Sequence, residues 1–208
     1  MARGDLGVGL QVDGRFVAVL GAHSVQALEA ESGAVVGIWP DGRIAFSNGA
    51  WQRFALSNAG ADVLVRWPLG ADLLSGISGG LRDYYASAFA RALARGEAWE
   101  QTYACHSPRS TRQFQMRVLP LAGRGLLLIH SLVAEAELEI LASGDAERYF
   151  DADGVVRQCS NCRRTQRVGA PAAWDWVPAF VASCPPRTSH SICSACINQY
   201  YPEFREAA

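Results

Sequence analysis

Four cysteines near the end of the chain occur as two doublets, Cys159-x-x-Cys162 and Cys193-x-x-Cys196. Two thiolates at this spacing can hold one side of a tetrahedral Zn²⁺, and a second doublet brought back by a loop completes the four ligands. A redox-active thiol pair or two disulfides would use the same residues. Residues 1–13 contain one arginine and no apolar segment typical of a secretory signal. We therefore expect a reducing cytoplasm, which favours zinc over disulfides.

His190 lies three residues before Cys193 and offers a fifth potential ligand. A structural zinc site takes four ligands, so His190 either supports a thiolate by a hydrogen bond or replaces one cysteine. The set of four cysteines is the preferred interpretation. No His-x-Glu phrase precedes the doublets, as a catalytic deaminase-type zinc would require. The site is expected to be structural, and no enzymatic activity is expected.

The charge of the chain argues against nucleic acid as a partner. The formal net charge is −1, and residues 145–208 contain seven arginines and seven acidic residues. Four thiolates on Zn²⁺ would add two negative charges, so phosphates would meet no general positive surface. We interpret Arg163, Arg164 and Arg167 as compensation for the anionic metal site. All 19 basic side chains are arginine, and the lack of lysine excludes Schiff-base chemistry and a phosphate-loop lysine.

Size and hydropathy indicate one ordinary domain and one small one. The chain has 208 residues, half of them hydrophobic, which allows a sizeable core. No apolar segment approaches the ~20 residues of a membrane-spanning helix, so we expect no membrane association. Residues 155–208 have too few large apolar side chains for a core of their own, and zinc binding should therefore contribute to their folding.

The pattern of apolar residues predicts two strands, helices and then three strands within residues 30–133. The first two strands flank a turn at Asp41-Gly42, where the turn chemistry fits a hairpin. Residues 81–94 have apolar side chains at helical spacing, with glycines before and after them. Three more strands are expected, over residues 99–106, 112–119 and 125–131. In the middle one, apolar and polar residues alternate, which is typical of a sheet with one solvated face.

Two phrases in this region are distinctive. The first is Asp41-Gly42-Arg43-Ile44, followed by Asn48, Trp51 and Phe54. The second is Tyr103-Ala104-Cys105-His106-Ser107-Pro108, followed by Phe114-Gln115-Met116-Arg117-Val118. With the order of elements, they resemble a PAS domain of a bacterial subgroup that has a Cys-His-Ser-Pro turn in its central hairpin. The resemblance covers residues 30–133 and implies an α+β fold, with an antiparallel five-stranded sheet and flanking helices.

The end of the chain carries a second resemblance. Its phrases are Cys159-Ser160-Asn161-Cys162-Arg163-Arg164, Trp176-Val177, His190-Ser191-Ile192-Cys193-Ser194-Ala195-Cys196 and Tyr201-Pro202-Glu203-Phe204. They are similar to a short cysteine-rich module that follows PAS or receiver domains in bacterial signalling proteins. The resemblance implies a small zinc-ribbon-like module over residues 155–208, with zinc as its cofactor.

The PAS resemblance also implies a space between sheet and helices that could admit a small ligand. The candidate lining residues are Trp39, Phe46, Trp51, Phe54, Tyr85, Phe89, Tyr103, Phe114, Met116 and His130. The alternative is that these side chains simply fill the core. His106 or His130 could ligate haem iron, and flavin is the other coloured cofactor to consider. No phrase typical of either cofactor is present, so a colourless ligand or none is expected.

An acidic linker, residues 134–154, is expected to be partly helical. Apolar residues recur at helical spacing between Leu132 and Leu141, with glutamates between them. A helix shorter than ~12–15 residues is marginal by itself and must dock on the sheet or on a second copy. A homodimer is therefore expected. Residues 1–29 form an N-terminal extension, with a short hairpin expected around Asp13-Gly14.

These features predict a bacterial cytoplasmic signalling or regulatory protein. A PAS sensor or interaction domain would be coupled to a structural four-cysteine zinc module. No kinase, receiver or cyclase phrase was found, so the expected output is contact with a protein partner. Two alternatives stay open: a thiol-based redox sensor that releases zinc on oxidation, and a PAS sensor that binds haem or flavin.

Overall fold

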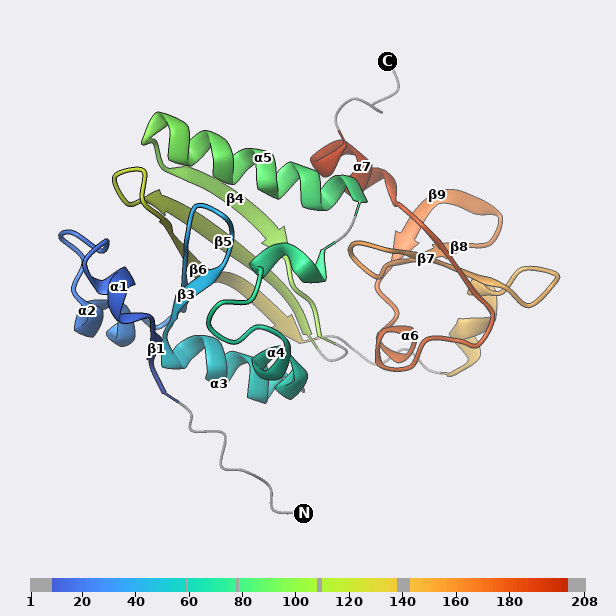
Figure 1. Cartoon of the computed structure of the whole chain (residues 1–208). Coiled ribbons are helices and arrows are strands. Elements are labelled where there is room, and N and C mark those ends of the chain that lie inside the picture. The colour runs from blue at the N-terminus through green and yellow to red at the C-terminus, as the bar shows by residue number, and fades with distance from the viewer. Residues whose placement is uncertain (1–8, 59, 78, 108–109, 138–142, 202–208) are drawn as a thin grey trace. The chain divides into compact units, whose positions relative to one another are not determined.

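The chain is organised as two compact units. A computed structural model describes residues 9–58, 60–77, 79–107, 110–137 and 143–201 (Figure 1). The first unit comprises Met1–Tyr103 and Phe114–Leu132, and the second comprises Ala104–Gln113 and Val133–Ala208. Residues Ala104–Gln113, which interrupt the first unit in sequence, therefore cluster with the C-terminal part of the chain.

A six-stranded sheet runs through the first unit. The strands are β1 (Gln11–Val12), β2 (Ala34–Ile38), β3 (Ile44–Ser47), β4 (Trp99–Ala104), β5 (Ser110–Pro120) and β6 (Leu126–Glu137). Their order in the sheet is β1-β3-β2-β6-β5-β4, and the sheet is antiparallel. The five expected strands correspond to β2 to β6. The sixth, β1, coincides with the first arm of the hairpin expected around Asp13-Gly14, but it pairs with β3, so that Val12 lies opposite Phe46.

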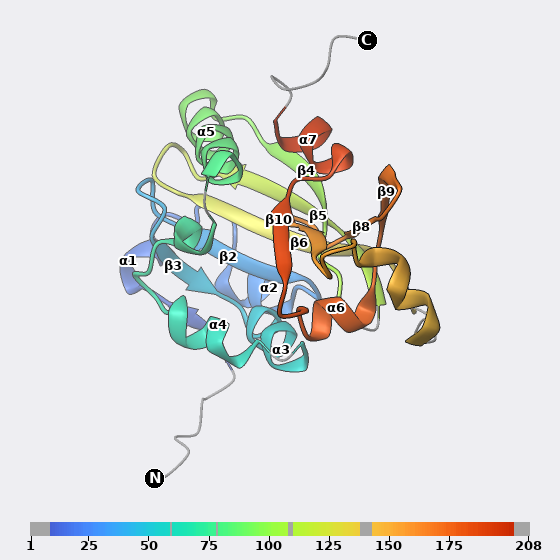
Figure 2. The ribbon, with the colours of Figure 1, turned by 90° about the vertical axis from the view of Figure 1, so that its right-hand side faces the viewer.

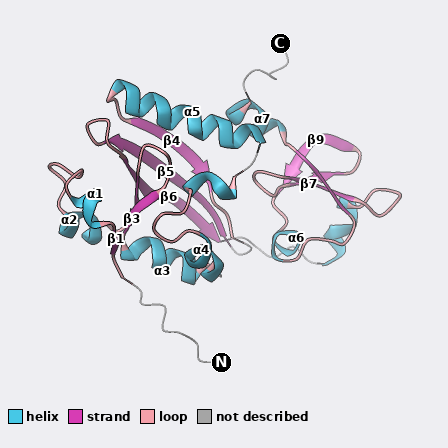
Figure 3. Ribbon diagram, in the orientation of Figure 1, coloured by secondary structure: helices cyan, strands magenta, loops and turns pink. Residues whose placement is uncertain are grey.

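Helices connect the strands and cover the sheet (Figures 1 and 3). They are α1 (Gly14–Val17), α2 (Val25–Ala30), α3 (Gly49–Ser57), α4 (Ala61–Arg66), the 3-10 helix η1 (Leu73–Gly76) and α5 (Gly79–Arg95). The helix predicted over residues 81–94 is confirmed as α5. The hairpin at Asp41-Gly42 is also confirmed: the backbone N–H of Trp39 donates to the Arg43 carbonyl, and Gly42 has a positive φ of 84°.

Both faces of the central strands are buried. Along β6, Leu126 and Leu128 belong to one apolar core, whereas Leu127 packs in the other. The first core includes Phe89 of α5, and the second includes Phe16 of α1. The expectation of one solvated face therefore holds only for part of the sheet, because the N-terminal helices cover the second face of β2, β3 and β6.

The polar face that the sequence predicted is present on β5. Phe114, Met116 and Val118 are buried on one side of this strand. On the other side, Gln115 and Arg117 both donate side-chain hydrogen bonds to the Glu100 carboxylate, at 2.8 Å and 3.0 Å. Alternation of apolar and polar side chains therefore predicted this strand correctly, and its polar side chains pair with Glu100 of the neighbouring strand β4.

The hairpin expected around Asp13-Gly14 is wrong. Asp13 instead caps α1, since its carboxylate accepts from the backbone N–H of Arg15 at 3.0 Å. Phe16 is fully buried, with its ring 5.0 Å from that of Trp39 in an edge-to-face contact. A Cβ on Gly37 would lie 2.4 Å from the Phe16 ring, so glycine is needed at this position. Burial of one aromatic side chain against a distant strand outweighs the local turn signal.

The helix expected from Leu132 onwards is also wrong where the structure describes it. β6 continues to Glu137, and residues 138–142 lie outside the described part of the chain. The strand is held by neighbouring β5: Arg112 forms an ion pair with Glu135 at 2.7 Å, and Thr111 donates to the Ala136 carbonyl at 3.4 Å. Pairing between strands therefore decides the structure here.

The second unit has a small sheet of its own. Its elements are the 3-10 helix η2 (Ser143–Tyr149), β7 (Val156–Cys159), β8 (Thr165–Arg167), β9 (Ala170–Asp175), α6 (Pro178–Ala182), β10 (Thr188–Ser191) and α7 (Ser194–Tyr200). The strand order is β10-β7-β8-β9, and β10 runs parallel to β7. Figure 2 shows β10 in red, with β8 and β9 in orange.

Apolar packing in this unit is limited. One core cluster consists of Tyr149, Val156, Val177 and Phe180, and a second consists of cysteines. The Tyr149 hydroxyl donates to the Asp175 carboxylate at 2.9 Å, which ties η2 to β9. The end of the expected linker therefore packs as part of this small unit.

Asn48 provides a test of the first unit. Its side chain is fully buried, and its oxygen accepts from the backbone N–H groups of Val35 and Trp51, at 2.9 Å and 3.0 Å. Its amide nitrogen donates to the carbonyls of Leu28 and Gly33, at 3.1 Å and 3.0 Å. The residue thus caps α3 and joins α2, β2 and β3.

We expect Asn48→Ala to lower the free energy of unfolding by about 3 kcal/mol or more, because each buried group left unpaired costs about 1–3 kcal/mol. Asn48→Asp should be at least as damaging, since a carboxylate cannot donate to the two carbonyls. Urea titrations followed by circular dichroism measure both. The control is Asn58→Ala, which removes the hydrogen bond that this side chain donates to the Phe54 carbonyl and should cost less, since one neutral hydrogen bond contributes about 1 kcal/mol. Equal losses for the two alanine variants would contradict the prediction.

Candidate metal centre

The four cysteines of the two doublets come together in the second unit. The Sγ atoms of Cys159, Cys162, Cys193 and Cys196 all lie within 4.8 Å of one another. The Cys162 and Cys193 sulfurs are 3.6 Å apart. Tetrahedral Zn–S bonds of ~2.3 Å place sulfurs ~3.8 Å apart. The cluster is therefore spaced to bind one metal ion.

The first doublet lies in the turn between β7 and β8. Cys159 ends β7, and its backbone N–H donates to the Arg164 carbonyl at 2.7 Å. The backbone N–H of Arg163 donates to the Cys159 carbonyl at 3.0 Å, and Arg163 has a positive φ of 64°. This left-handed residue turns the chain back directly after Cys162, so that both thiols of the doublet face the same point.

The second doublet begins α7. Cys193 occupies the N-cap position of that helix and Cys196 lies in its first turn. Parallel pairing of β10 with β7 places Ser191 opposite Cys159, two residues before Cys193. The backbone N–H of Cys193 donates to the Cys159 sulfur at 3.4 Å. The two doublets thus start from the ends of neighbouring strands, which explains how residues far apart in sequence form one site.

Electrostatics favour a cation in this cluster. Hydrogen bonds from the thiols of Cys162, Cys193 and Cys196 lower the pKa of Cys159, which favours its thiolate form. Hydrogen bonds with Cys159, Cys162 and Cys193 raise the pKa of Cys196 far above its usual range. Four thiols this close together cannot all be ionised without a compensating positive charge. A divalent ion supplies that compensation and allows four thiolates to form.

The cluster is largely closed to solvent. Cys159, Cys193 and Cys196 are buried, and Cys162 is half-buried. Trp174, Ile192 and Tyr200 pack around the four cysteines. Such a shell excludes water, which is typical of a structural site and not of a site with an open position for substrate.

His190 lies apart from the cluster. It is exposed on β10, opposite Gln158 in the register with β7. Within the described residues, the cluster of metal-binding side chains consists of the four cysteines alone. The other two cysteines are also outside it: Cys105 is half-buried in the turn after β4, and Cys184 is exposed.

The arginines near the doublets have other partners. Arg167 forms an ion pair with Asp175, with 2.9 Å between Nη2 and Oδ1. Arg163 donates to the Gln158 side chain at 3.4 Å. The predicted role of these side chains as charge compensation is therefore not visible in their contacts, because a carboxylate and an amide already accept their hydrogen bonds.

The ten residues predicted to line a ligand pocket do not share one space. Trp39 and Phe46 pack in the core that contains Phe16. The other core, on the opposite face of the central strands, contains five of the ten, namely Trp51, Tyr85, Phe89, Tyr103 and Met116. Strand alternation separates the two groups, so the sequence could suggest each residue as buried but not which face it occupies.

The remaining three form a chain of contacts with Tyr103. The Phe114 ring stacks on Tyr103 at 5.7 Å and meets Phe54 edge-on at 5.5 Å. The Tyr103 hydroxyl lies 2.8 Å from Nδ1 of His130. Burial lowers the pKa of His130 to about 4, so this imidazole is neutral at pH 7 and accepts from tyrosine if its other nitrogen carries the proton.

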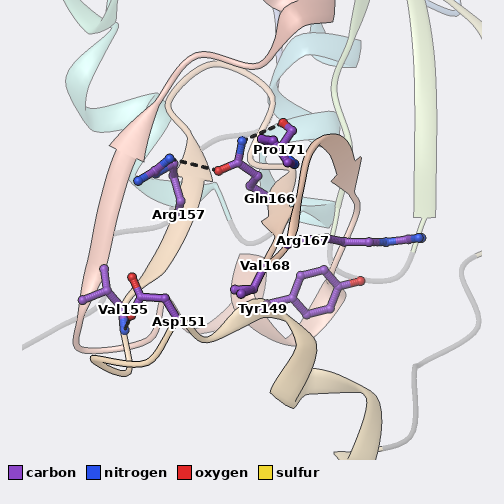
Figure 4. A pocket seen from close by; sticks show the side chains of 9 residues that line it. Tyr149, Asp151, Val155, Arg157, Gln166, Arg167, Val168 and Pro171 are labelled. Carbon is purple, nitrogen blue, oxygen red and sulfur yellow. Dashed lines mark hydrogen bonds between the residues drawn. The ribbon is translucent and has the colours of Figure 1, made fainter.

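A cavity of about 230 Å³ lies in the second unit (Figure 4). Its lining residues are Tyr149, Asp151, Val155, Arg157, Gln166, Arg167, Val168, Gly169 and Pro171. Figure 4 shows Arg157 and Gln166 directed toward each other, and they are hydrogen-bonded at 3.1 Å. None of the predicted pocket residues lines this cavity. No spacing in the sequence indicated it, because its walls come from η2, the following turn and three strands.

No model of a known protein family matches the chain, and none of the curated proteins is significantly similar to it. In the part of the chain that the structure describes, no helix combines the length and apolar character needed to cross a bilayer. The fold and site define an α+β protein with a four-cysteine cluster that can bind a metal ion.

Replacing one cluster cysteine should abolish metal binding and unfold only the second unit. We expect Cys196→Ser to lose the bound metal and the protection of residues 155–200 from hydrogen exchange, because the metal supplies folding free energy there. Elemental analysis and exchange measured by mass spectrometry report the two effects. Cys184→Ser is the matched control, since Cys184 is exposed and outside the cluster. Full metal content in Cys196→Ser would contradict the assignment.

His190→Ala should leave the metal bound. We expect affinity to fall by no more than ~10–100-fold, the range of changes outside the ligand set. X-ray absorption at the metal edge should show sulfur scatterers only, in the wild type as in the variant. A clear imidazole contribution in the wild type would overturn the four-cysteine set.

Proposed function

We propose that this chain is a signalling or regulatory protein in which a PAS-like sensor or interaction domain is coupled to a structural zinc module. The four-cysteine cluster carries the proposal, since it is a complete and largely buried ligand set. The PAS-like part corresponds to residues 30–133. It is supported by the order of elements, two strands followed by helices and three strands.

Zinc is the proposed metal because of the ligand chemistry. Four thiolates form a soft donor set, which suits Zn²⁺ or an iron–sulfur centre and not Mg²⁺ or Ca²⁺. A closed tetrahedral site leaves no position for a reacting water. The proposed module is therefore zinc-ribbon-like and structural, and the proposed output is contact with a protein partner in the reducing cytoplasm of a bacterium.

Any ligand in the sensor domain is proposed to be colourless and non-covalent. Its interior holds packed aromatic rings, and His130 lies beside the Tyr103 hydroxyl. Dimerisation remains a prediction. With residues up to Glu137 in β6, a dimer would use surfaces other than the helix expected there.

One native mass spectrum of anaerobically purified protein, with elemental analysis, tests this proposal. We expect one zinc per chain, no haem or flavin, and the mass of a dimer. Less than about half an equivalent of zinc would count against the module. A Soret band or flavin absorption would refute the colourless sensor.

A thiol-based redox sensor is the second candidate. The Cys162 and Cys193 sulfurs are 3.6 Å apart, close enough to form a disulfide after a small movement. Two thiolates and two protons would reduce hydrogen peroxide to two waters, form the disulfide and release the metal. Stoichiometric zinc release by peroxide, reversed by a thiol reductant, would favour this candidate. Retention of zinc under mild peroxide would exclude it.

A further inference from the structure

The turn between β4 and β5 belongs to the metal-binding unit. Residues Ala104–Gln113 cluster with Val133–Ala208, although β4 and β5 are strands of the large sheet. Both strands therefore run through two compact units. The turn is well bonded internally, since the backbone N–H of Cys105 donates to the Arg112 carbonyl at 3.1 Å and that of Ser107 donates to the Ser110 carbonyl at 2.9 Å.

His106 is the residue of this turn that contacts the small sheet. Its ring lies 4.5 Å from the ring of Trp176, at an angle of 66°. The backbone N–H of Arg112 donates to Nδ1 of His106 at 2.9 Å, so the proton of the neutral ring is on Nε2. The hydrogen bond within its own hairpin thus sets the orientation and the tautomer of the His106 ring, and the ring contacts the indole of Trp176.

Both rings carry a buried donor without an acceptor among the described residues. Nε2 of His106 and Nε1 of Trp176 are inaccessible and lack a hydrogen-bond partner. A buried donor without an acceptor is destabilising. An N–H group directed at an aromatic face recovers part of this cost. The two rings stay in contact although neither donor is paired. This indicates that other contacts hold each ring in place, those of the β4–β5 turn for His106 and those of the small sheet for Trp176.

On the other side, Trp176 is connected to the metal cluster through the small sheet. It follows Asp175, which pairs with Thr165 of β8, and Arg164 precedes Thr165. The carbonyl of Arg164 accepts from the backbone N–H of Cys159, a cluster cysteine. Burial, and then the charge of Arg164, lower the pKa of His106 and keep its ring neutral. Cys159 is therefore connected to His106 by one backbone hydrogen bond, one strand pairing and one ring contact.

We propose that metal binding orders the β4–β5 turn through the contact between His106 and Trp176, which couples occupancy of the metal centre to two strands of the large sheet. This inference rests on the proposed metal site. A metal that fixes β7, β8 and the end of β9 also fixes Trp176, and Trp176 holds the turn. Linkage makes the coupling reciprocal, so that a change in the turn alters metal affinity by the same factor.

Hydrogen exchange of the full chain, with metal and after chelation, tests the coupling. On metal removal, we expect residues 104–113 to lose protection together with residues 155–200. Helix α5, which has no residue in the second unit, should keep its protection. Unchanged protection of residues 104–113 in protein that has lost one equivalent of metal would overturn the inference and leave the metal site intact. Absence of metal from the purified protein would instead overturn the proposed function.

His106→Asn isolates the ring contact. The asparagine oxygen can still accept from the Arg112 N–H, but no ring faces Trp176. We expect metal affinity to fall ~5–10-fold, at the low end of usual coupling energies, and residues 104–113 to exchange equally with and without metal. Trp176→Phe, which keeps an aromatic ring and removes the unpaired donor, should retain the metal-dependent protection.

Phe150→Ala is the matched control within the same unit. The Phe150 ring lies 5.6 Å from the Phe180 ring, so this substitution weakens packing in the second unit and leaves the side chains of His106 and Trp176 unchanged. We expect this variant to keep the metal-dependent protection of residues 104–113. Full metal-dependent protection in His106→Asn, measured beside this control, would overturn the proposed role of the ring.

Discussion

The second unit depends on one electrostatic constraint. Four thiols lie within 4.8 Å of one another in a largely buried cluster, and they can be ionised together only around a cation. The apolar packing of this unit is small: beside the cysteines it consists mainly of Tyr149, Val156, Val177 and Phe180. Burial on this scale does not offset the conformational entropy of about sixty residues. A metal bound by the four cysteines would join β7, the β7–β8 turn and α7 and would supply the missing stabilisation.

The first unit has a different basis. Two apolar cores cover the two faces of its central strands, and the buried side chain of Asn48 joins α2, β2, β3 and α3 by four hydrogen bonds. This unit can fold on apolar burial alone. Its interior is already occupied by packed rings, so a ligand that entered would displace side chains such as Tyr103. In the proposed sensor role, the response would therefore be rearranged packing.

The two kinds of stabilisation meet along the chain in β4 and β5. These strands belong to the large sheet, yet the turn between them clusters with the metal-binding unit. The turn has its own hydrogen bonds, and the Arg112–Glu135 ion pair holds it to the extended end of β6. Loss of the metal would therefore reach strands that apolar burial stabilises. The contact between His106 and Trp176 is the side-chain pair proposed to carry this effect, and substitution of either residue tests it.

The sequence by itself determined the features that arise from neighbouring residues. The spacing within each cysteine doublet, the Asp41-Gly42 hairpin and the helix at α5 depend on contacts a few residues apart, and all three are found. The pairing of the doublets was inferred from metal chemistry, and the parallel register of β10 with β7 is how the fold achieves it.

Only the tertiary structure decided the features that depend on distant partners. Asp13-Gly14 begins a helix because Phe16 is buried against Gly37, and residues 133–137 are extended because β5 lies beside them. The predicted pocket residues divide between two faces of one sheet, which no spacing reveals. In each case a contact far along the chain contributes more free energy than the local pattern, and the sequence does not show which distant residue will provide it.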